Sequence, residues 1–298
     1  MIPSLFVSDL HGKQSRYKTL FDAIAAEEPA AVFLGGDLLP SFALPASNPV
    51  MSPEGFVLGF LLPQLSDLRQ RLGARYPRVF IIPGNDDPRA EEEDLLEGEQ
   101  RGVWEYAHNR VLTFGEYRVA GYACVPPTPF LLKDWERYDV SRYVDPGSIP
   151  PTEGRHTVAF SPRELEHSTI QSDLERLSEG LLFNRTVFLF HAPPYRTALD
   201  RAALDGVTVD HAPLDPHVGS IAIKRFIEKH QPLVTLHGHV HESARLTGAW
   251  RENIGTTVAL SAAHDGPELA LVRFDLEHPE SATRELRGNG GGASAPGR

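Results

Sequence analysis

The chain has 298 residues and a formal net charge of −11, because 40 Asp and Glu residues outnumber 29 Lys and Arg residues. An acidic total disfavours a nucleic-acid partner, because phosphate backbones are bound by clustered Lys and Arg. The single cysteine, Cys124, excludes an internal disulfide framework and predicts a reducing, cytoplasmic location. Every apolar run is far shorter than the roughly 20 residues of a membrane span, so we expect no membrane partner.

The first third of the sequence alternates short apolar runs with helical spacing. Apolar runs predict buried strands at 5–7, 31–34 and 79–82. Between them, apolar residues at helical spacing predict helices over 16–27 and 56–72. Short buried strands separated by helices predict a parallel sheet that is covered by helices.

The same alternation continues in the rest of the chain. Further strands are predicted at 103–106, 110–114, 117–122, 187–190 and 233–236. Further helices are predicted over 90–100, 162–178 and 218–229. The last apolar segments predict antiparallel strands at 244–246, 257–261 and 269–274.

These patterns predict a single domain over residues 1–286. Residues 124–160 are rich in Pro, Asp and aromatics without a sustained period, which indicates an irregular insertion. The insertion could cap a site, with Trp135 or Tyr138 stacking on a substrate base, or those side chains could simply pack. Residues 287–298 are rich in Gly, Ala and Ser, and we expect a disordered tail.

Side chains that can bind metal follow five of the predicted strands. They are Asp9, His11, Asp37, Asn85, His191, His239 and His241. We expect them to meet, because ligands bind at the carboxyl edge of an open α/β sheet. Oxygen and nitrogen ligands without thiolate suit Mn, Fe, Ni, Zn or Co. Seven groups exceed one tetrahedral site, so we expect two divalent metal ions sharing a carboxylate, with Mn²⁺ as the first expectation.

The order of these motifs, D-x-H, G-D, G-N, H and G-H-x-H, resembles the calcineurin-like metallophosphoesterase superfamily. Residues 7–12 and 238–243 are similar to its bacterial and archaeal branch, which is related to class III cyclic-nucleotide phosphodiesterases. The resemblance implies an α/β fold in which two mixed β-sheets pack as a sandwich with flanking helices, in four layers α/β/β/α. It also implies that strands of the C-terminal third, including the one before His237, build the second sheet.

The resemblance further divides the seven candidates into a first metal triad, a second metal triad and a bridging carboxylate: Asp9, His11 and His241; Asn85, His191 and His239; and Asp37. The family's reaction is attack of a metal-bridging hydroxide on phosphorus, in which two cations neutralise charge on the phosphoryl oxygens. We therefore expect a metal-dependent phosphoesterase with a small phosphoester substrate.

The leading expectation is a phosphodiesterase that acts on a small nucleotide or cyclic nucleotide. One alternative is a phosphomonoesterase, including a phosphoprotein phosphatase. An alternative of another class is a regulatory protein that binds metal or nucleotide but has lost turnover.

One position departs from the family pattern. Many members have His after Gly-Asn, where it can protonate the leaving oxygen, whereas this chain has Asp86. An ionised Asp is a poor proton donor at neutral pH. Either Asp86 holds a proton beside its neighbours, or His217 or His237 donates instead, or the substrate has a good leaving group. His237 could equally satisfy a backbone hydrogen bond, and we expect the following Asp87 to be solvated.

Overall fold

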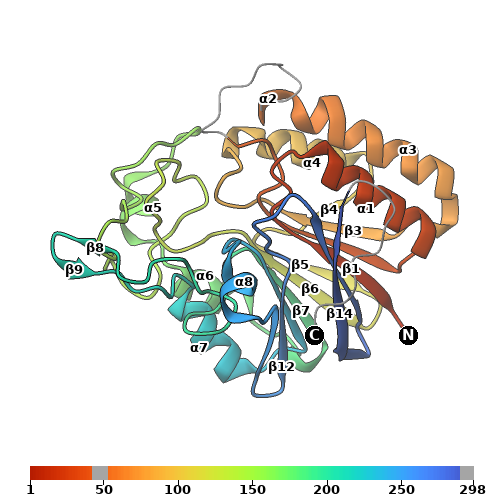
Figure 1. Ribbon diagram of the computed structural model, residues 1–298. Coiled ribbons are helices and arrows are strands. Elements are labelled where there is room, and N and C mark those ends of the chain that lie inside the picture. The colour runs from red at the N-terminus through yellow and green to blue at the C-terminus, as the bar shows by residue number, and fades with distance from the viewer. Residues whose placement is uncertain (42–52, 289–298) are drawn as a thin grey trace.

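The protein is built on two six-stranded mixed sheets that pack face to face, with helices on the outer faces (Figure 1). This computed structural model describes residues 1–41 and 53–288. The first sheet has the order β14 (His278–Arg287), β13 (Leu269–Asp275), β1 (Pro3–Val7), β2 (Ala31–Gly35), β3 (Arg78–Ile82) and β4 (Glu105–Tyr106). The second has the order β11 (Arg251–Ile254), β12 (Thr257–Ser261), β10 (Val234–His237), β7 (Thr186–Phe190), β6 (Tyr117–Tyr122) and β5 (Arg110–Phe114). The α/β/β/α sandwich is thus confirmed.

The strands β1, β2 and β3 are parallel and buried on both faces. Phe6 and Phe33 face inward and belong to the core shared with the second sheet. Leu5 and Val32, one residue earlier on each strand, face outward and pack with the helices α1 (Gln14–Glu27) and α3 (Leu62–Leu72). Because successive side chains point to opposite faces, a strand buried on both sides must be apolar throughout.

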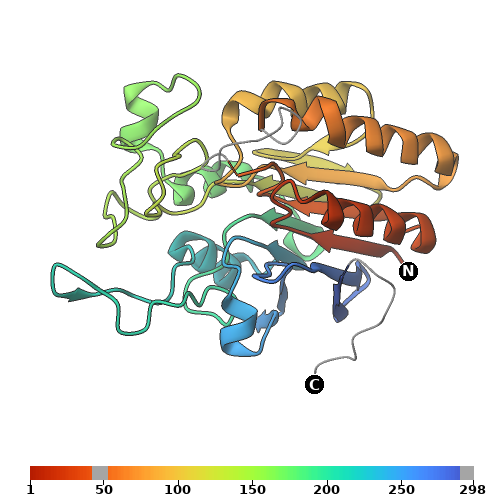
Figure 2. The ribbon, with the colours of Figure 1, turned by 45° about the horizontal axis from the view of Figure 1, so that its top comes forward.

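The other elements complete the two outer layers (Figure 2). On the first sheet's side, α2 (Pro53–Phe56) runs through a π-helical turn (Val57–Leu61) into α3, and α4 (Glu92–Gln100) follows β3. The second sheet is covered by α6 (Ile170–Leu177) and α7 (Ile221–His230), whose apolar side chains join its core. The hairpin of β8 (Thr208–Val209) and β9 (Ala212–Pro213) projects from this body. Single 3₁₀ turns occupy Gly73–Arg75, Arg89–Glu91 and Phe183–Arg185.

Two sequence-based element predictions are wrong. The single helix predicted over 162–178 is two helices, α5 (Pro162–His167) and α6, because Ser168 is extended. Thr169 then starts α6 as an N-cap, in a reciprocal capping box with Ser172. The strand predicted at 244–246 is part of the short helix α8 (Ser243–Thr247). A three-residue apolar pattern is too short to distinguish a strand from a helical turn.

The C-terminal third does not all join the second sheet. The strand before His237 does, as expected, together with β11 and β12. However, β13 pairs antiparallel with β1 and therefore extends the first sheet, with β14 beyond it. In addition, β12 lies parallel to β10 and antiparallel only to β11. Strand periodicity reports which faces are buried but not which strand is the neighbour.

The irregular insertion, residues 124–160, contains no helix or strand and packs through its aromatic side chains. Trp135 and Tyr138 are 1% and 3% exposed, so the packing alternative holds and stacking on a substrate base is excluded. Of the expected tail 287–298, Arg287 ends β14, and residues 289–298 lie outside the described part of the chain.

Asp139 ties this insertion to the second sheet's outer helix. Its carboxylate accepts hydrogen bonds from the Ser220 hydroxyl at 2.5 Å and the Ile221 amide at 2.6 Å. It also lies 3.2 Å from the amide nitrogen of Ala222. These donors belong to the first turn of α7 and its N-cap, where a negative charge is stabilised by the unpaired amides.

We therefore predict that Asp139→Ala lowers the free energy of unfolding by about 1–2 kcal/mol, the cost of losing a charged cap. Urea unfolding monitored by circular dichroism measures this loss. The matched control is Asp67→Ala, which removes a carboxylate that is 63% exposed and paired with Arg71 on α3. A loss for Asp139→Ala no larger than for this control would contradict the capping role.

Candidate metal centre

The two sheets meet at one edge, where hydrogen bonds cross between the loops that follow their strands. The His191 ring, directly after β7, has Nδ1 2.8 Å from the Gly35 carbonyl oxygen at the end of β2. The His239 amide, after β10, donates to Asp9 Oδ1 at 3.0 Å, after β1. These contacts join the carboxyl ends of strands from both sheets, as expected from the motif positions.

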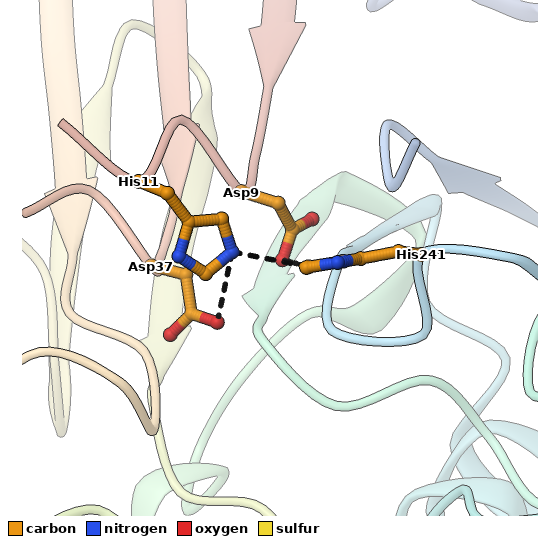
Figure 3. A group of neighbouring side chains, drawn as sticks. All are labelled: Asp9, His11, Asp37 and His241. Carbon is orange, nitrogen blue, oxygen red and sulfur yellow. Dashed lines mark hydrogen bonds and ion pairs between the residues drawn. The ribbon is translucent and has the colours of Figure 1, made fainter. Parts of the chain in front are cut away.

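One group of four side chains converges at this edge. Ligand atoms of Asp9, His11, Asp37 and His241 all lie within 4.8 Å of one another. Figure 3 shows the His11 ring between the Asp37 carboxylate and the His241 ring. The Nε2 atoms of His11 and His241 are 3.1 Å apart, and His241 Nε2 lies 3.3 Å from Asp9 Oδ1. This is the geometry of a candidate metal-binding group.

The remaining three predicted ligands lie beside this group. His191 Nε2 is 3.1 Å from Asn85 Oδ1 and 3.3 Å from Asp37 Oδ1. The His239 ring packs edge-on against the His191 ring, with centroids 5.3 Å apart. Asp37 contacts both groups, because its other oxygen, Oδ2, lies 3.7 Å from His11 Nε2. The structure thus brings all seven predicted ligands together.

A cation fits these residues on independent grounds. Asp9 is fully buried, and within the described chain its Oδ2 has no hydrogen-bond partner. An unpaired buried carboxylate oxygen is costly, so this atom requires a positive charge nearby. The surrounding donors are imidazole nitrogens and carboxylate or amide oxygens, which are the ligands of divalent transition metals. The residues present therefore fit a metal centre.

Protons partly supply this positive charge when metal is absent. Burial lowers the pKa of His191, but Asp37 and Asp9 outweigh it and raise the value to about 9. Burial also lowers the pKa of His11, but Asp86, Asp37 and Asp9 outweigh burial and raise the pKa to about 9. Burial raises the pKa of Asp9, yet the neighbouring His241 and His191 bring it down to about 2. By contrast, burial and His191 lower the pKa of His239 to about 3.

The backbone adopts unusual conformations to deliver these ligands. Asp9, His11, Asp37 and His239 have φ angles of 57°, 46°, 51° and 73°, in the left-handed region. Each such non-glycine residue costs roughly 1–3 kcal/mol unless the surroundings enforce it. Backbone hydrogen bonds hold two of these residues in the left-handed conformation. The Asp9 amide donates to the Gly36 carbonyl at 2.9 Å, and the His11 amide donates to the Asp37 carbonyl at 2.8 Å.

Glycines let the loops approach closely. A Cβ on Gly36 would lie 2.6 Å from His191 Nδ1, and one on Gly84 would overlap the Asp37 carboxylate. The Gly-Asp and Gly-Asn pairs of the sequence are therefore explained by space, since no larger residue leaves room for the ligands.

Asp87 is buried, so the expectation that it is solvated is wrong. It is 1% exposed and accepts hydrogen bonds from the Leu38, Leu39 and Gly84 amides at 2.8–3.0 Å. Burial, assisted by Asp37, raises its pKa to about 7. Asp87 therefore joins the loop after β3 to the loop after β2. The sequence signal was the Gly-Asn-Asp-Asp pattern of residues 84–87, which is typical of a tight turn. The structure closes this turn with a hydrogen bond from the Asp87 amide to the Gly84 carbonyl.

Asp86 lies inside the site. Its Oδ2 is 3.2 Å from His11 Nδ1, and its Oδ1 accepts a hydrogen bond from the Ser41 hydroxyl at 3.2 Å. Its amide donates to Asp37 Oδ1 at 2.8 Å.

The two histidines suggested as substitute proton donors are placed differently. His237 is fully buried, with Nδ1 2.9 Å from the Ala192 carbonyl oxygen and Nε2 2.8 Å from Thr235 Oγ1. Burial lowers its pKa to about 4, so both nitrogens serve the fold, and the alternative of a satisfied structural histidine holds. His217 is partly exposed, and its Nδ1 pairs with the buried Asp200 carboxylate at 2.8 Å. Its contacts in the described chain include none of the seven predicted ligands.

The comparison with known families agrees with this geometry. The profile of the calcineurin-like phosphoesterases matches residues 2–243. The chain belongs to the calcineurin-like phosphoesterase family. This calcineurin-like phosphoesterase is accordingly a metal-dependent hydrolase of phosphoric esters. A search of curated proteins gives no match.

Solved structures share the fold of this calcineurin-like phosphoesterase at low identity. One crystal structure is 19% identical, with a TM-score of 0.59, and covers 96% of this chain and 98% of its own. That of TT1561 of Thermus thermophilus is 16% identical, with a TM-score of 0.54, and covers 95% and 98%. A novel archaeal phosphodiesterase is 10% identical and covers 95% and 99%, with a TM-score of 0.45. At these identities, the first two structures show a shared fold and nothing more.

Across residues 1–41 and 53–288, no helix combines the length and the apolar character that a membrane crossing requires.

The raised histidine pKa values predict how pH affects metal binding. Below about pH 6.5, both His11 and His191 contribute stability to the metal-free fold, and this contribution is lost as pH rises through 9. Metal must displace both protons, so each adds up to about 1.4 kcal/mol of apparent affinity per pH unit over the same range. The increase in Tm caused by saturating Mn²⁺ should therefore grow between pH 6.5 and 9. An increase that stays constant or shrinks would contradict these assignments.

Proposed function

We propose that this enzyme is a phosphodiesterase that hydrolyses a small nucleotide or cyclic nucleotide with two divalent metal ions. The observation that carries the proposal is the position of Asp37, whose Oδ1 faces His191 and whose Oδ2 faces His11. A carboxylate with one oxygen on each side suits a ligand shared between two cations. Asp37 would therefore be the bridging ligand.

The other predicted ligands divide between the two positions: Asp9, His11 and His241 for the first cation, and Asn85, His191 and His239 for the second. When bound, the two cations would lower the pKa of a water molecule and offset charge on the phosphoryl oxygens. Nitrogen and oxygen donors without sulfur suit Mn, Fe, Ni, Zn or Co, and Mn²⁺ is the proposed metal to test first.

The charge of the site supports a diester substrate. Three carboxylates, from Asp9, Asp37 and Asp86, face the group of ligands. Two divalent cations would leave one net positive charge, and the attacking hydroxide would offset it. A phosphodiester carries one negative charge, whereas a monoester at neutral pH carries close to two. The only Lys or Arg contact to these three residues in the described chain is Arg16, which donates to the Asp9 carbonyl oxygen. The charge balance therefore favours the diester.

His217 is the proposed source of the proton for the leaving group. Asp200 accepts hydrogen bonds from the amides of Arg196 and Thr197 and from His217 Nδ1, which orients the ring. This segment lies beside the loop that carries His241, because the Ala203 amide donates to Glu242 Oε1 at 3.0 Å. With Nδ1 held by Asp200, His217 would offer Nε2 to a leaving oxygen.

The proposed location is the cytoplasm. Burial raises the pKa of the Cys124 thiol to about 11, so this buried cysteine is chemically inert and makes no demand on an oxidising compartment.

The decisive experiment is hydrolysis of bis(p-nitrophenyl) phosphate by chelator-stripped protein before and after addition of Mn²⁺, with p-nitrophenyl phosphate assayed in parallel. Diester hydrolysis that returns with metal supports the proposal. Faster turnover of the monoester would favour a phosphomonoesterase or phosphoprotein phosphatase. Metal binding without turnover of either compound would favour a regulatory role, and cyclic nucleotides would then be tested as ligands by thermal shift.

We predict that Asp37→Ala abolishes both binding of two metal ions and hydrolysis of the diester, because the shared ligand is lost. Metal content after dialysis measures stoichiometry, and the diester assay measures rate. The control Asp67→Ala, a surface carboxylate on α3, should retain both. Two bound metal ions in Asp37→Ala would rule out the bridging role.

A further inference from the structure

We propose that Asp86 is a positioning residue that orients His11 toward the first metal, and that it is not the proton donor of the reaction. This inference rests on the proposed function, since it assigns a task to a residue beside the proposed ligands. Its basis is the arrangement of His11 between two sets of partners.

The two ring nitrogens of His11 face opposite partners. Nε2 lies 3.1 Å from His241 Nε2 and 3.7 Å from Asp37 Oδ2, among the other candidate ligands. Nδ1 lies 3.2 Å from Asp86 Oδ2. An imidazole that binds metal through the Nε2 lone pair carries its hydrogen on Nδ1, and that hydrogen needs an acceptor. Within the described chain, Asp86 is the acceptor in place.

Asp86 is itself held in this position. The Ser41 hydroxyl donates to its Oδ1 at 3.2 Å, and its own amide donates to Asp37 Oδ1 at 2.8 Å. One carboxylate oxygen therefore accepts from Ser41 and the other from His11, which leaves Asp86 acting as an acceptor on both sides. A proton donor would instead need a hydrogen directed at the leaving oxygen. The carboxylate at this position serves the ligand His11.

The His11 ring depends on this partner because, within the described chain, Asp86 is the side chain that contacts Nδ1. The His11 side chain is 17% exposed and that of Asp86 is 24% exposed, so both lie at the rim of the site, where their polar contacts hold them. The ring's aromatic neighbour is His241, edge-on at 5.0 Å between centroids. Removing the carboxylate would free the ring to rotate and would leave its tautomer undetermined, which weakens the metal site before it affects any proton transfer.

The test compares Asp86→Ala, which removes the acceptor, with Asp86→Asn, which keeps an oxygen acceptor of nearly the same shape without the charge. Isothermal titration with Mn²⁺ measures affinity in the wild type, both variants and the control Asp67→Ala. We expect about 10–100-fold weaker binding for Asp86→Ala, as for other residues that orient a metal-bound His, with partial recovery in Asp86→Asn. Circular dichroism and thermal unfolding without metal establish that each variant is folded.

Rates at saturating Mn²⁺ provide the second readout, with diesters of p-nitrophenol and of a poorer leaving alcohol. A positioning role predicts the same fractional loss for both substrates in Asp86→Ala. Wild-type affinity in Asp86→Ala, combined with a loss confined to the poorer leaving group, would overturn the proposal and make Asp86 the proton donor. A wild-type protein that neither binds Mn²⁺ nor hydrolyses the diester would overturn the proposed function itself, whereas unchanged affinity in Asp86→Ala alone refutes only this inference.

Discussion

The accumulation of buried negative charge where the two sheets meet is the constraint on which the site depends. Asp9 and Asp37 are almost completely buried, and Asp9 Oδ2 has no protein partner in the described chain. Such carboxylates are tolerated only beside compensating positive charge. The raised pKa values of His11 and His191 show that protons supply part of it. A metal ion would replace those protons, which couples the stability of this edge to the function of a phosphoesterase.

The architecture of the sandwich brings these carboxylates together at one edge of the two sheets. Parallel strands of both sheets end at the same edge, and His191 reaches across to the Gly35 carbonyl. Left-handed backbone at Asp9 and Asp37, and the close approach of Gly84 to Asp37, bring these short side chains together. The apolar layers supply the rigidity that holds such strained residues, because the strands behind them are buried on both faces.

The hydrogen-bond partner on the outer nitrogen of each candidate histidine ligand fixes the direction of its other nitrogen. Gly35 holds one nitrogen of His191, and Asp86 holds one nitrogen of His11, so in both rings the other nitrogen is directed inward. Asp87 performs a related task for the backbone by joining the loops after β2 and β3. Asp86, at a position where the family resemblance led us to expect histidine, is therefore compatible with the proposed metal site.

The sequence alone indicated the buried strands, the seven candidate ligands and the family, because apolar runs and the polar motifs that follow them are local signals. It could not place β13 beside β1, distinguish the short helix α8 from a strand, or show Asp87 to be buried. Those facts depend on which segments become neighbours, and neighbours are set by packing across the whole chain. For the same reason, only the tertiary structure gave His237 a structural role and turned Asp86 toward His11.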